Sequence, residues 1–187
     1  MEGIAVERHE LRYRRPFDWS SMLAFLAARA TRDIEAVAAG RYVRTLVVDG
    51  SPGWLAVSAV PAADALAIEL SPSLAPSAEA ILARARHAFD LDADPEAIGA
   101  ALGDLGAGRP GLRVPHAFDG FEIAVRAILG QQVSVRGAST LAGRFAAAFG
   151  EPIETPFPEL SRLPPTVARV AELGVGDVAG IGMPGTR

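Results

Sequence analysis

The chain has 187 residues, half of them hydrophobic, and a formal net charge of −4, so it is long enough for one large or two small domains with a substantial core. It has no cysteine, which excludes disulfides, thiolate metal sites and iron–sulfur clusters, and its three widely spaced histidines indicate neither a metal site nor a cofactor. No apolar run reaches the ~18 residues of a membrane span and the N-terminus lacks a secretory signal, so we expect a soluble cytoplasmic protein.

The first part of the chain has the pattern of an antiparallel sheet. Leu11 and Tyr13 alternate with arginines, as in a half-exposed strand. Further strands are expected at 42–48, 54–60 and 65–70, separated by clusters of turn residues at 49–53 and 61–64. Sequential strands joined by short turns favour antiparallel pairing, so residues ~10–70 are expected to form such a sheet.

Helices are expected to cover this sheet. Asp18 is placed to cap a helix that runs to Ala30. A second helix is expected over residues 77–89, with Ile81, Leu82 and Ala85 on its buried side. Asp94 followed by Pro95 predicts the start of one more short helix, because proline suits the first helical position.

A domain boundary is predicted in the stretch 103–115, which is rich in Gly and Pro and after which the strand signals cease. We therefore expect an α+β domain over residues 1–112 and a helical domain over 113–187. The net negative charge arises in the first domain, which has 11 Arg and 15 acidic residues. The second domain has seven of each and is therefore neutral. Beyond the two helices described next, short helices are expected near Leu160 and over 167–173, and Pro184 is expected to begin another.

Two consecutive helices open the second domain. Asp119 and Glu122 indicate a helix start of the capping-box type, and Gly130 is expected to end that helix in the left-handed conformation. Ser134 is expected to cap the next helix, which ends at Gly150. The buried faces are expected to be Phe121, Val125, Ile128 and Leu129 on the first helix, and Val135, Ala138, Leu141, Ala142 and Phe145 on the second.

Between these helices, the residues Gly130-Gln131-Gln132-Val133 form a predicted tight corner. We expect Gln132 to be exposed and Val133 to point inward. Two long amides at one corner have two interpretations: both cap the ends of the helices, or they contact a partner. From the residues alone the two interpretations are equally good.

The segment Ala-Ile-Leu-Gly-Gln-Gln-Val-Ser (127–134) resembles the corner that opens the helical domain of the helix-hairpin-helix DNA glycosylases. Residues 17–30, 40–46, 109–115 and 173–184 resemble, in the same order, blocks of the bacterial 3-methyladenine DNA glycosylase II (AlkA) family. The resemblance covers almost the whole chain. It implies a first domain like the TATA-binding protein, α+β with an antiparallel sheet, followed by an incomplete all-helical domain of the helix-hairpin-helix glycosylase type.

The resemblance implies a monomeric enzyme without a cofactor that removes alkylated purines from double-stranded DNA by base flipping. At the position of Gln132 it implies a plug that fills the space left by the extruded nucleotide, while Gln131 orients the corner. Ser134 and Arg136, at the start of the following helix, become candidate phosphate contacts. The competing role for these residues is helix capping alone.

Phe25 and Arg29 are candidate pocket residues. With Met22 and Leu26 they share one face of the helix 18–30, and core packing is the usual role of such a phenylalanine. The resemblance instead places Phe25 in the base pocket, where an electron-rich ring stacks on a positively charged methylated base. Arg29 is either a second pocket residue or a surface ion-pair partner.

No catalytic residue is assigned within the chain. The resemblance implies a later Gly-rich hairpin and a following Asp that stabilises the sugar cation, and both are expected beyond Arg187; Gly180-Ile-Gly182 matches an earlier family segment instead. We therefore expect residues 1–187 alone to be inactive. The alternative is a non-catalytic DNA-binding or structural remnant, possible also as part of a fusion with an alkylation-response regulator. Lesion preference is not predicted.

Overall fold

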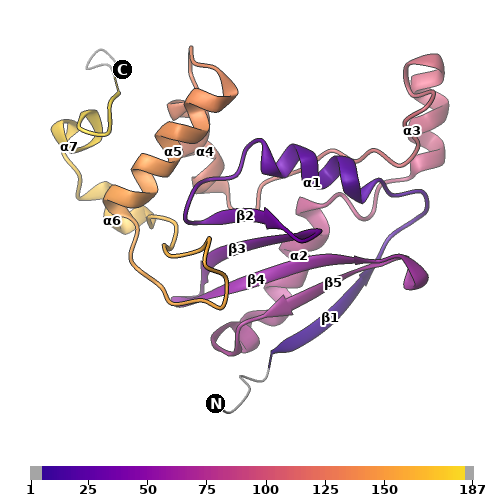
Figure 1. Ribbon diagram of the computed structural model, residues 1–187, viewed down its shortest axis with the longest axis horizontal. Helices are drawn as coiled ribbons and strands as arrows, with labels where there is room; N and C mark the ends of the chain where they lie inside the picture. Colours follow the sequence, from indigo (N-terminus) through magenta and orange to yellow (C-terminus); the bar gives the residue numbers. More distant parts are fainter. Residues whose placement is uncertain (1–5, 184–187) are drawn as a thin grey trace.

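The computed structural model describes residues 6–183, within which the strands form one five-stranded antiparallel sheet (Figure 1). The strands are β1 (Glu7–Arg12), β2 (Glu35–Ala38), β3 (Arg41–Val48), β4 (Ser51–Val60) and β5 (Ala65–Leu70). Their order in the sheet is β1-β5-β4-β3-β2. The α+β prediction with an antiparallel sheet is thereby confirmed, although the edge strand β2 was not predicted.

The turn between β3 and β4 is tighter than the sequence pattern indicated. Only Asp49 and Gly50 form it, both with positive φ (51° and 78°), as the type I′ hairpin turn requires. Val48 therefore pairs directly with Ser51, and Pro52 and Gly53 belong to β4 instead of the turn.

Helices α1 (Trp19–Ala27) and α2 (Ala78–Ala88) cover the same face of the sheet, as predicted. Met22 of α1 and Ile81 and Ala85 of α2 are buried in one cluster with strand residues such as Leu55 and Ile68. Asp18 caps α1 by accepting a hydrogen bond from the Ser21 amide. The prediction that both helices pack on the sheet is confirmed, and α1 ends three residues earlier than expected.

The opposite face of the sheet is partly covered by the segment that follows α5 (Val135–Phe149). Phe157 packs edge-to-face on Trp54, with ring centroids 5.0 Å apart, and Leu160 is buried beside Val43. The helix expected near Leu160 is absent from the described chain, because this residue forms a parallel bridge with Asp33 instead. Sheet and helical part are thus joined on this side by extended chain.

The remaining helices are α3 (Pro95–Leu102), α4 (Gly120–Leu129), α6 (Val167–Ala171) and α7 (Val175–Ala179). Figure 1 shows α4 to α7 gathered at one end of the sheet, while α3 stands apart at the other. Asp94 and Asp119 cap α3 and α4 as predicted. α7 was not predicted, and the helix expected from Pro184 lies outside the described residues.

The Gly- and Pro-rich stretch before α4 is fastened to the first part of the chain. The buried Arg113 donates to the carbonyl oxygen of Arg14 at 2.7 Å, and its guanidinium lies over the Phe17 ring. Gly111 has φ 83°, and a Cβ there would lie 2.7 Å from the Phe17 nitrogen. Only glycine fits this approach. The boundary between 1–112 and 113–187 stays a prediction.

Candidate functional site

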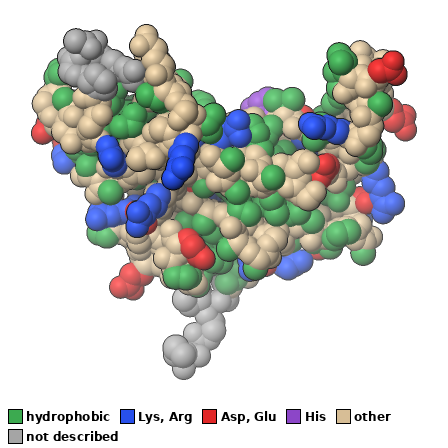
Figure 2. Space-filling view, turned by 45° about the horizontal axis from the view of Figure 1, so that its top comes forward, with side chains coloured by type: hydrophobic (Ala, Val, Ile, Leu, Met, Phe, Trp, Pro, Cys, Tyr) green, Lys and Arg blue, Asp and Glu red, His purple; other side chains and the backbone are tan. Residues whose placement is uncertain are grey.

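A cavity of about 600 Å³ lies where α1, the sheet and helices α4 and α5 meet. Figure 2 shows hydrophobic side chains along the hollow between the arm that carries α3 and the helical end of the molecule. The residues that line the cavity and carry the argument below are Phe25, Arg29, Glu35, Tyr42, Arg44, His116, Phe118, Asp119, Glu122 and Arg126.

Phe25 presents its ring to this cavity, although its place on the apolar stripe of α1 also suits a core residue. Its side chain is 38% exposed, so it is not part of the closed core. The guanidinium of Arg29 lies 3.7 Å from the ring centroid, and its Nη1 donates to the Phe25 carbonyl oxygen at 3.4 Å. The π face of Phe25 therefore contacts a cation just after the end of its own helix. The pocket role of both residues remains a prediction.

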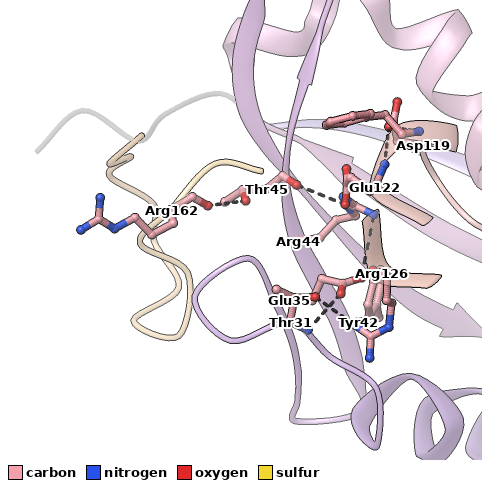
Figure 3. A network of polar contacts seen from close by, with 10 residues as sticks. Thr31, Glu35, Tyr42, Arg44, Thr45, Asp119, Glu122, Arg126 and Arg162 are labelled. Carbon is pink, nitrogen blue, oxygen red and sulfur yellow. Dashed lines mark hydrogen bonds and ion pairs between the residues drawn. The ribbon is translucent and has the colours of Figure 1, made fainter. Parts of the chain in front are cut away.

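The floor of the cavity is a buried polar network (Figure 3). Arg44 on β3 donates from one nitrogen to both carboxylate oxygens of Glu122 on α4, at 2.7 Å each. Glu35 on β2 lies 3.8 Å from the same guanidinium and accepts a 2.5 Å hydrogen bond from the Tyr42 hydroxyl. The Arg44 guanidinium also lies over the Phe118 ring. This network joins the sheet to the first helix of the helical part.

Burial and pairing shift the protonation equilibria of this network in opposite directions. Burial lowers the pKa of Arg44, but the charge of Glu122 and other neighbours raises it by more, so Arg44 stays charged. Burial raises the pKa of Glu122, and Arg44 opposes this rise. Burial also raises the pKa of Tyr42 well above its ordinary value. The network therefore holds an ion pair beside a neutral phenol.

Each carboxylate of the cavity lining already has partners. Asp119 accepts from the amides of Phe121 and Glu122, which confirms its predicted capping role. Glu122 bonds Arg44 and does not complete the capping box. Glu35 accepts from Tyr42 and from the Thr31 amide. Among the described residues, Glu35 and Glu122 are bonded through both carboxylate oxygens, whereas Asp119 is bonded through Oδ1 alone.

The corner between α4 and α5 has a different backbone from the one expected. Gly130 has φ −83°, and Gln132 takes the left-handed conformation instead, with φ 57°. A Cβ at Gly130 would lie 3.0 Å from the Arg126 carbonyl oxygen, a tight contact, and 3.5 Å from the Ala138 Cβ, an ordinary one. A non-glycine residue held at positive φ carries strain, which is common at functional sites.

The side chains of this corner are exposed. Gln131 and Gln132 are exposed, as predicted for Gln132, whereas Val133 is 38% exposed and does not point inward. Ser134 caps α5 by accepting from the Gly137 amide at 3.1 Å, which confirms the cap. Arg136 is exposed in the first turn of α5. Two expected core residues, Ile128 and Val135, are also exposed, because the helices lack a neighbour on that side within the described chain.

Sequence reasoning missed the pair Arg44–Glu122, whose members are 78 residues apart. One signal was available: Arg44 is a charge in the middle of the otherwise apolar strand Tyr-Val-Arg-Thr-Leu-Val-Val. A buried charge needs a partner, but the sequence does not say which one. Within residues 6–183 no three or more His, Asp or Glu side chains gather as in a metal site, and no helix is long and apolar enough to cross a membrane.

Comparison with known proteins gives a consistent result. A family model described as the AlkA N-terminal domain matches residues 8–119. The chain is 44% identical over 178 residues to DNA-3-methyladenine glycosylase 2 of Escherichia coli K12, which covers 94% of the chain and 62% of that protein. It is 41% identical over 172 residues to the probable bifunctional transcriptional activator/DNA repair enzyme AlkA of Mycobacterium tuberculosis, covering 89% of the chain and 34% of that protein.

Solved structures share the fold. A 3-methyladenine DNA-glycosylase from Archaeoglobus fulgidus superposes with a TM-score of 0.80 at 19% sequence identity. The match covers 95% of the present chain and 62% of the chain of that glycosylase. An 8-oxoguanine glycosylase/lyase from Clostridium acetobutylicum, in complex with double-stranded DNA, gives a TM-score of 0.64 at 15% sequence identity. This match covers 97% of the present chain and 61% of the chain of that enzyme. The chain thus spans less than two thirds of each of these relatives.

Proposed function

Because the chain belongs to the AlkA family, we propose that it provides the first part of an enzyme that excises alkylated purines from double-stranded DNA. The observation that carries this proposal is the position of an exposed phenylalanine ring in a cavity of about 600 Å³ near the exposed, strained corner with Gln132. The printed function of the Escherichia coli relative, a DNA-3-methyladenine glycosylase, supports the substrate class.

In this proposal the corner and the cavity act on one nucleotide. A glycosylase extrudes its target base from the stack and must stop the duplex from closing behind it. The exposed Gln132 fills the vacated space and offers amide hydrogen bonds to the widowed base. The extruded base enters the cavity and stacks on Phe25, whose π face attracts a positively charged alkylated purine.

The hydrolytic step needs a carboxylate that stabilises positive charge on the sugar. The cavity carboxylates of the described chain are engaged with Arg44, Tyr42, Thr31 and the start of α4. We propose that this carboxylate comes from a polypeptide segment equivalent to the part of the relatives that the chain does not match.

Lesion-selective binding tests the proposal. Fluorescence anisotropy with residues 1–187 should give tighter binding to a duplex with one positively charged alkylated purine than to the undamaged duplex. Gln132→Ala should reduce this preference several-fold without lowering the melting temperature, because an exposed side chain contributes little to stability. Equal affinity of the wild-type chain for both duplexes contradicts the proposal.

A second candidate is a non-catalytic DNA-binding module, alone or fused to a regulator. It is supported by the printed name of the Mycobacterium tuberculosis relative, which combines transcriptional activation with DNA repair. The reading frame after codon 187 separates the candidates: a frame that encodes a Gly-rich hairpin and an Asp supports the enzyme, and a stop codon supports the module.

A further inference from the structure

Ion pairing is unevenly distributed over this protein. Many arginines of the first part of the chain are paired with carboxylates, such as Arg8, Arg14, Arg15, Arg41, Arg44 and Arg86. Around α5 most of the described arginines contact neutral groups, as Arg126 and Arg162 do, and Arg32 lies 3.8 Å from the Asp33 carboxylate. Figure 2 shows the corresponding concentration of Arg side chains on the helical end of the molecule. Few of these arginines therefore have a carboxylate in direct contact, although residues 113–187 contain as many acidic residues as arginines.

Four of these arginines follow one edge of α5. Arg136 belongs to its first turn. Arg126 donates to the Ser139 hydroxyl at 2.9 Å, and the Arg32 Cβ would lie 3.2 Å from a Cβ at Gly143. Arg162 donates to the Gly150 carbonyl oxygen at 3.0 Å. Positions 136, 139 and 143 recur every three or four residues, so they lie on one side of α5, and Gly150 directly follows its last residue.

The contacts that position this arginine row (Arg32, Arg126, Arg136 and Arg162) leave its charge available. Arg126 also donates to the Thr31 hydroxyl, so its two partners are neutral. The Arg136 side chain makes no hydrogen bond or ion pair to any described residue, and only its carbonyl oxygen accepts from the Thr140 hydroxyl. The nearest carboxylate to Arg32 is Asp33, at the outer limit of an ion pair (3.8 Å), and the Arg32 side chain is 87% exposed. Gly143 is buried beneath Arg32, and the absence of a side chain there permits the close approach.

From this arrangement we propose that the arginine row is a second contact surface for duplex DNA, which holds the phosphates of the strand flanking the lesion. From position 136 to 150 the helix rises roughly 21 Å, equivalent to about six phosphates at ~3.4 Å of axis per strand. The arginine row begins about one helical turn after Gln132. If the Gln132 side chain inserts into a duplex, the backbone of that duplex can therefore run along the arginine row. Guanidinium groups suit this task because they form forked hydrogen bonds to phosphate.

The inference rests on the proposed function for its partner, but its contacts are to the backbone and do not depend on a lesion. Phosphate contacts carry no sequence information and make binding salt-dependent. The row should therefore strengthen binding to damaged and undamaged duplexes equally. Gln132 and Phe25 should affect only the damaged duplex, so the two proposals can fail separately.

The test compares two double variants of residues 1–187 with equal charge. Arg32→Gln/Arg162→Gln removes two members of the row. Arg12→Gln/Arg109→Gln removes two exposed arginines elsewhere that also make no ion pair with the described residues. Anisotropy with a fluorescent 20-base-pair duplex is measured over a range of salt concentrations. The row variant should bind about ten-fold more weakly near 0.1 M salt, and the slope of log K against log salt should fall by about 1.8, because each contact contributes ~0.9.

The control variant should keep the wild-type slope. Arg162→Gln also removes a hydrogen bond to Gly150, so Arg32→Glu, at an exposed side chain, provides a second measurement that does not depend on folding. It should weaken binding at least as much as the double variant while the melting temperature is unchanged. Equal effects of the row and control variants overturn the inference, as does a wild-type chain that binds no duplex at low salt. A row-dependent affinity without lesion preference supports the row and contradicts the glycosylase proposal.

Discussion

Arg44 is a single charged side chain in the interior of an apolar strand, 3% exposed, and Glu122 is its main partner. Removing the carboxylate leaves an uncompensated charge inside the protein. We expect Glu122→Ala to lower the free energy of unfolding by about 2–3 kcal/mol. This is no more than the smallest loss usual for breaking a fully buried ion pair, because the Glu122 side chain is 28% exposed. Urea denaturation monitored by circular dichroism measures this change.

The matched control for this prediction is Asp92→Ala. Asp92 pairs with Arg86, but its side chain is 76% exposed, and exposed pairs contribute little to stability. This substitution should change the free energy of unfolding by less than about 0.5 kcal/mol. Similar losses in the two variants would mean that Arg44 finds another partner, such as Glu35, when Glu122 is absent.

At the scale of residues, the sequence predicted contacts that are local in the chain and missed those that are not. The caps by Asp18, Asp119 and Ser134 were correct because each acts within three residues. The predicted conformation of Gly130 was wrong, because its φ is −83° and Gln132, at φ 57°, takes the left-handed conformation instead. The exposure of Gln132 was correct; its role in DNA binding is still a prediction.

The cap of α1 provides a prediction at the scale of elements. Hydrogen bonds from the Ser21 hydroxyl, the Ser21 amide and the Ser20 hydroxyl lower the pKa of Asp18 below its ordinary value of 3.8. A carboxylate with a lowered pKa stabilises the fold above its unfolded-state pKa, and this contribution is lost as the pH falls through 3.8 and below. Asp18→Ala should therefore cost about 1 kcal/mol at pH 7.

The pH dependence identifies the cause of this loss. The difference between Asp18→Ala and the wild type, measured by urea denaturation, should shrink as the pH is lowered from about 5 to about 2. Asp104→Ala is the control, because the Asp104 side chain makes no hydrogen bond within the described part of the chain. A difference that is constant with pH would show that the carboxylate charge of Asp18 is not responsible.

Two glycines at helix positions should respond to alanine in opposite ways. A Cβ at Gly99, inside α3, would meet no atom within 4 Å, so Gly99→Ala should raise stability by about 0.5–1 kcal/mol through helix propensity. A Cβ at Gly150 would lie 2.3 Å from the Leu163 carbonyl oxygen and 2.7 Å from that of Ala146. Gly150→Ala should cost about 2–3 kcal/mol, since backbone atoms cannot move aside. Thermal denaturation of both variants checks the signs.

Elements with strong periodicity were predicted, and elements formed by tertiary contacts were not. β3 and β5 and helices α2 and α5 have clear apolar patterns and were correct in kind and position. β2 is a four-residue strand of the sequence Glu-Ala-Val-Ala, which has little strand preference and forms by pairing with β3. The segment at Leu160 was expected to be helical but is fixed by its bridge to Asp33.

At the scale of the whole molecule, the two parts of the chain differ in how completely they are packed. The sheet and its covering helices enclose side chains such as Leu55 and Ile68 without exposure. On the helical part, apolar residues expected in the core are open, among them Ile128 (55%) and Val135 (50%). The amphipathic pattern correctly indicated that these faces are apolar. It gave no information on whether a neighbour covers them, because that depends on other segments.

The catalytic prediction belongs to this scale, because it depends on how the cavity is completed. We expect purified residues 1–187 to release no measurable 3-methyladenine or hypoxanthine from alkylated or deaminated DNA. Glu35 and Glu122, which line the cavity, are engaged through both carboxylate oxygens, and Asp119 is held at the start of α4 by the two amides that it caps, so each of the three already has a structural role.

Chromatography of free bases after incubation with damaged duplex measures this, with the Escherichia coli DNA-3-methyladenine glycosylase 2 as positive control. The exposed apolar faces favour association, so the assay needs a monomeric fraction separated by size. Robust release would mean that one of the three carboxylates does the chemistry. The catalytic carboxylate would then be identified with three variants, Glu35→Gln, Asp119→Asn and Glu122→Gln. Substitution of a residue that only supports the fold should lower the stability and the release of base together. Substitution of the catalytic residue should abolish the release of base at an unchanged melting temperature.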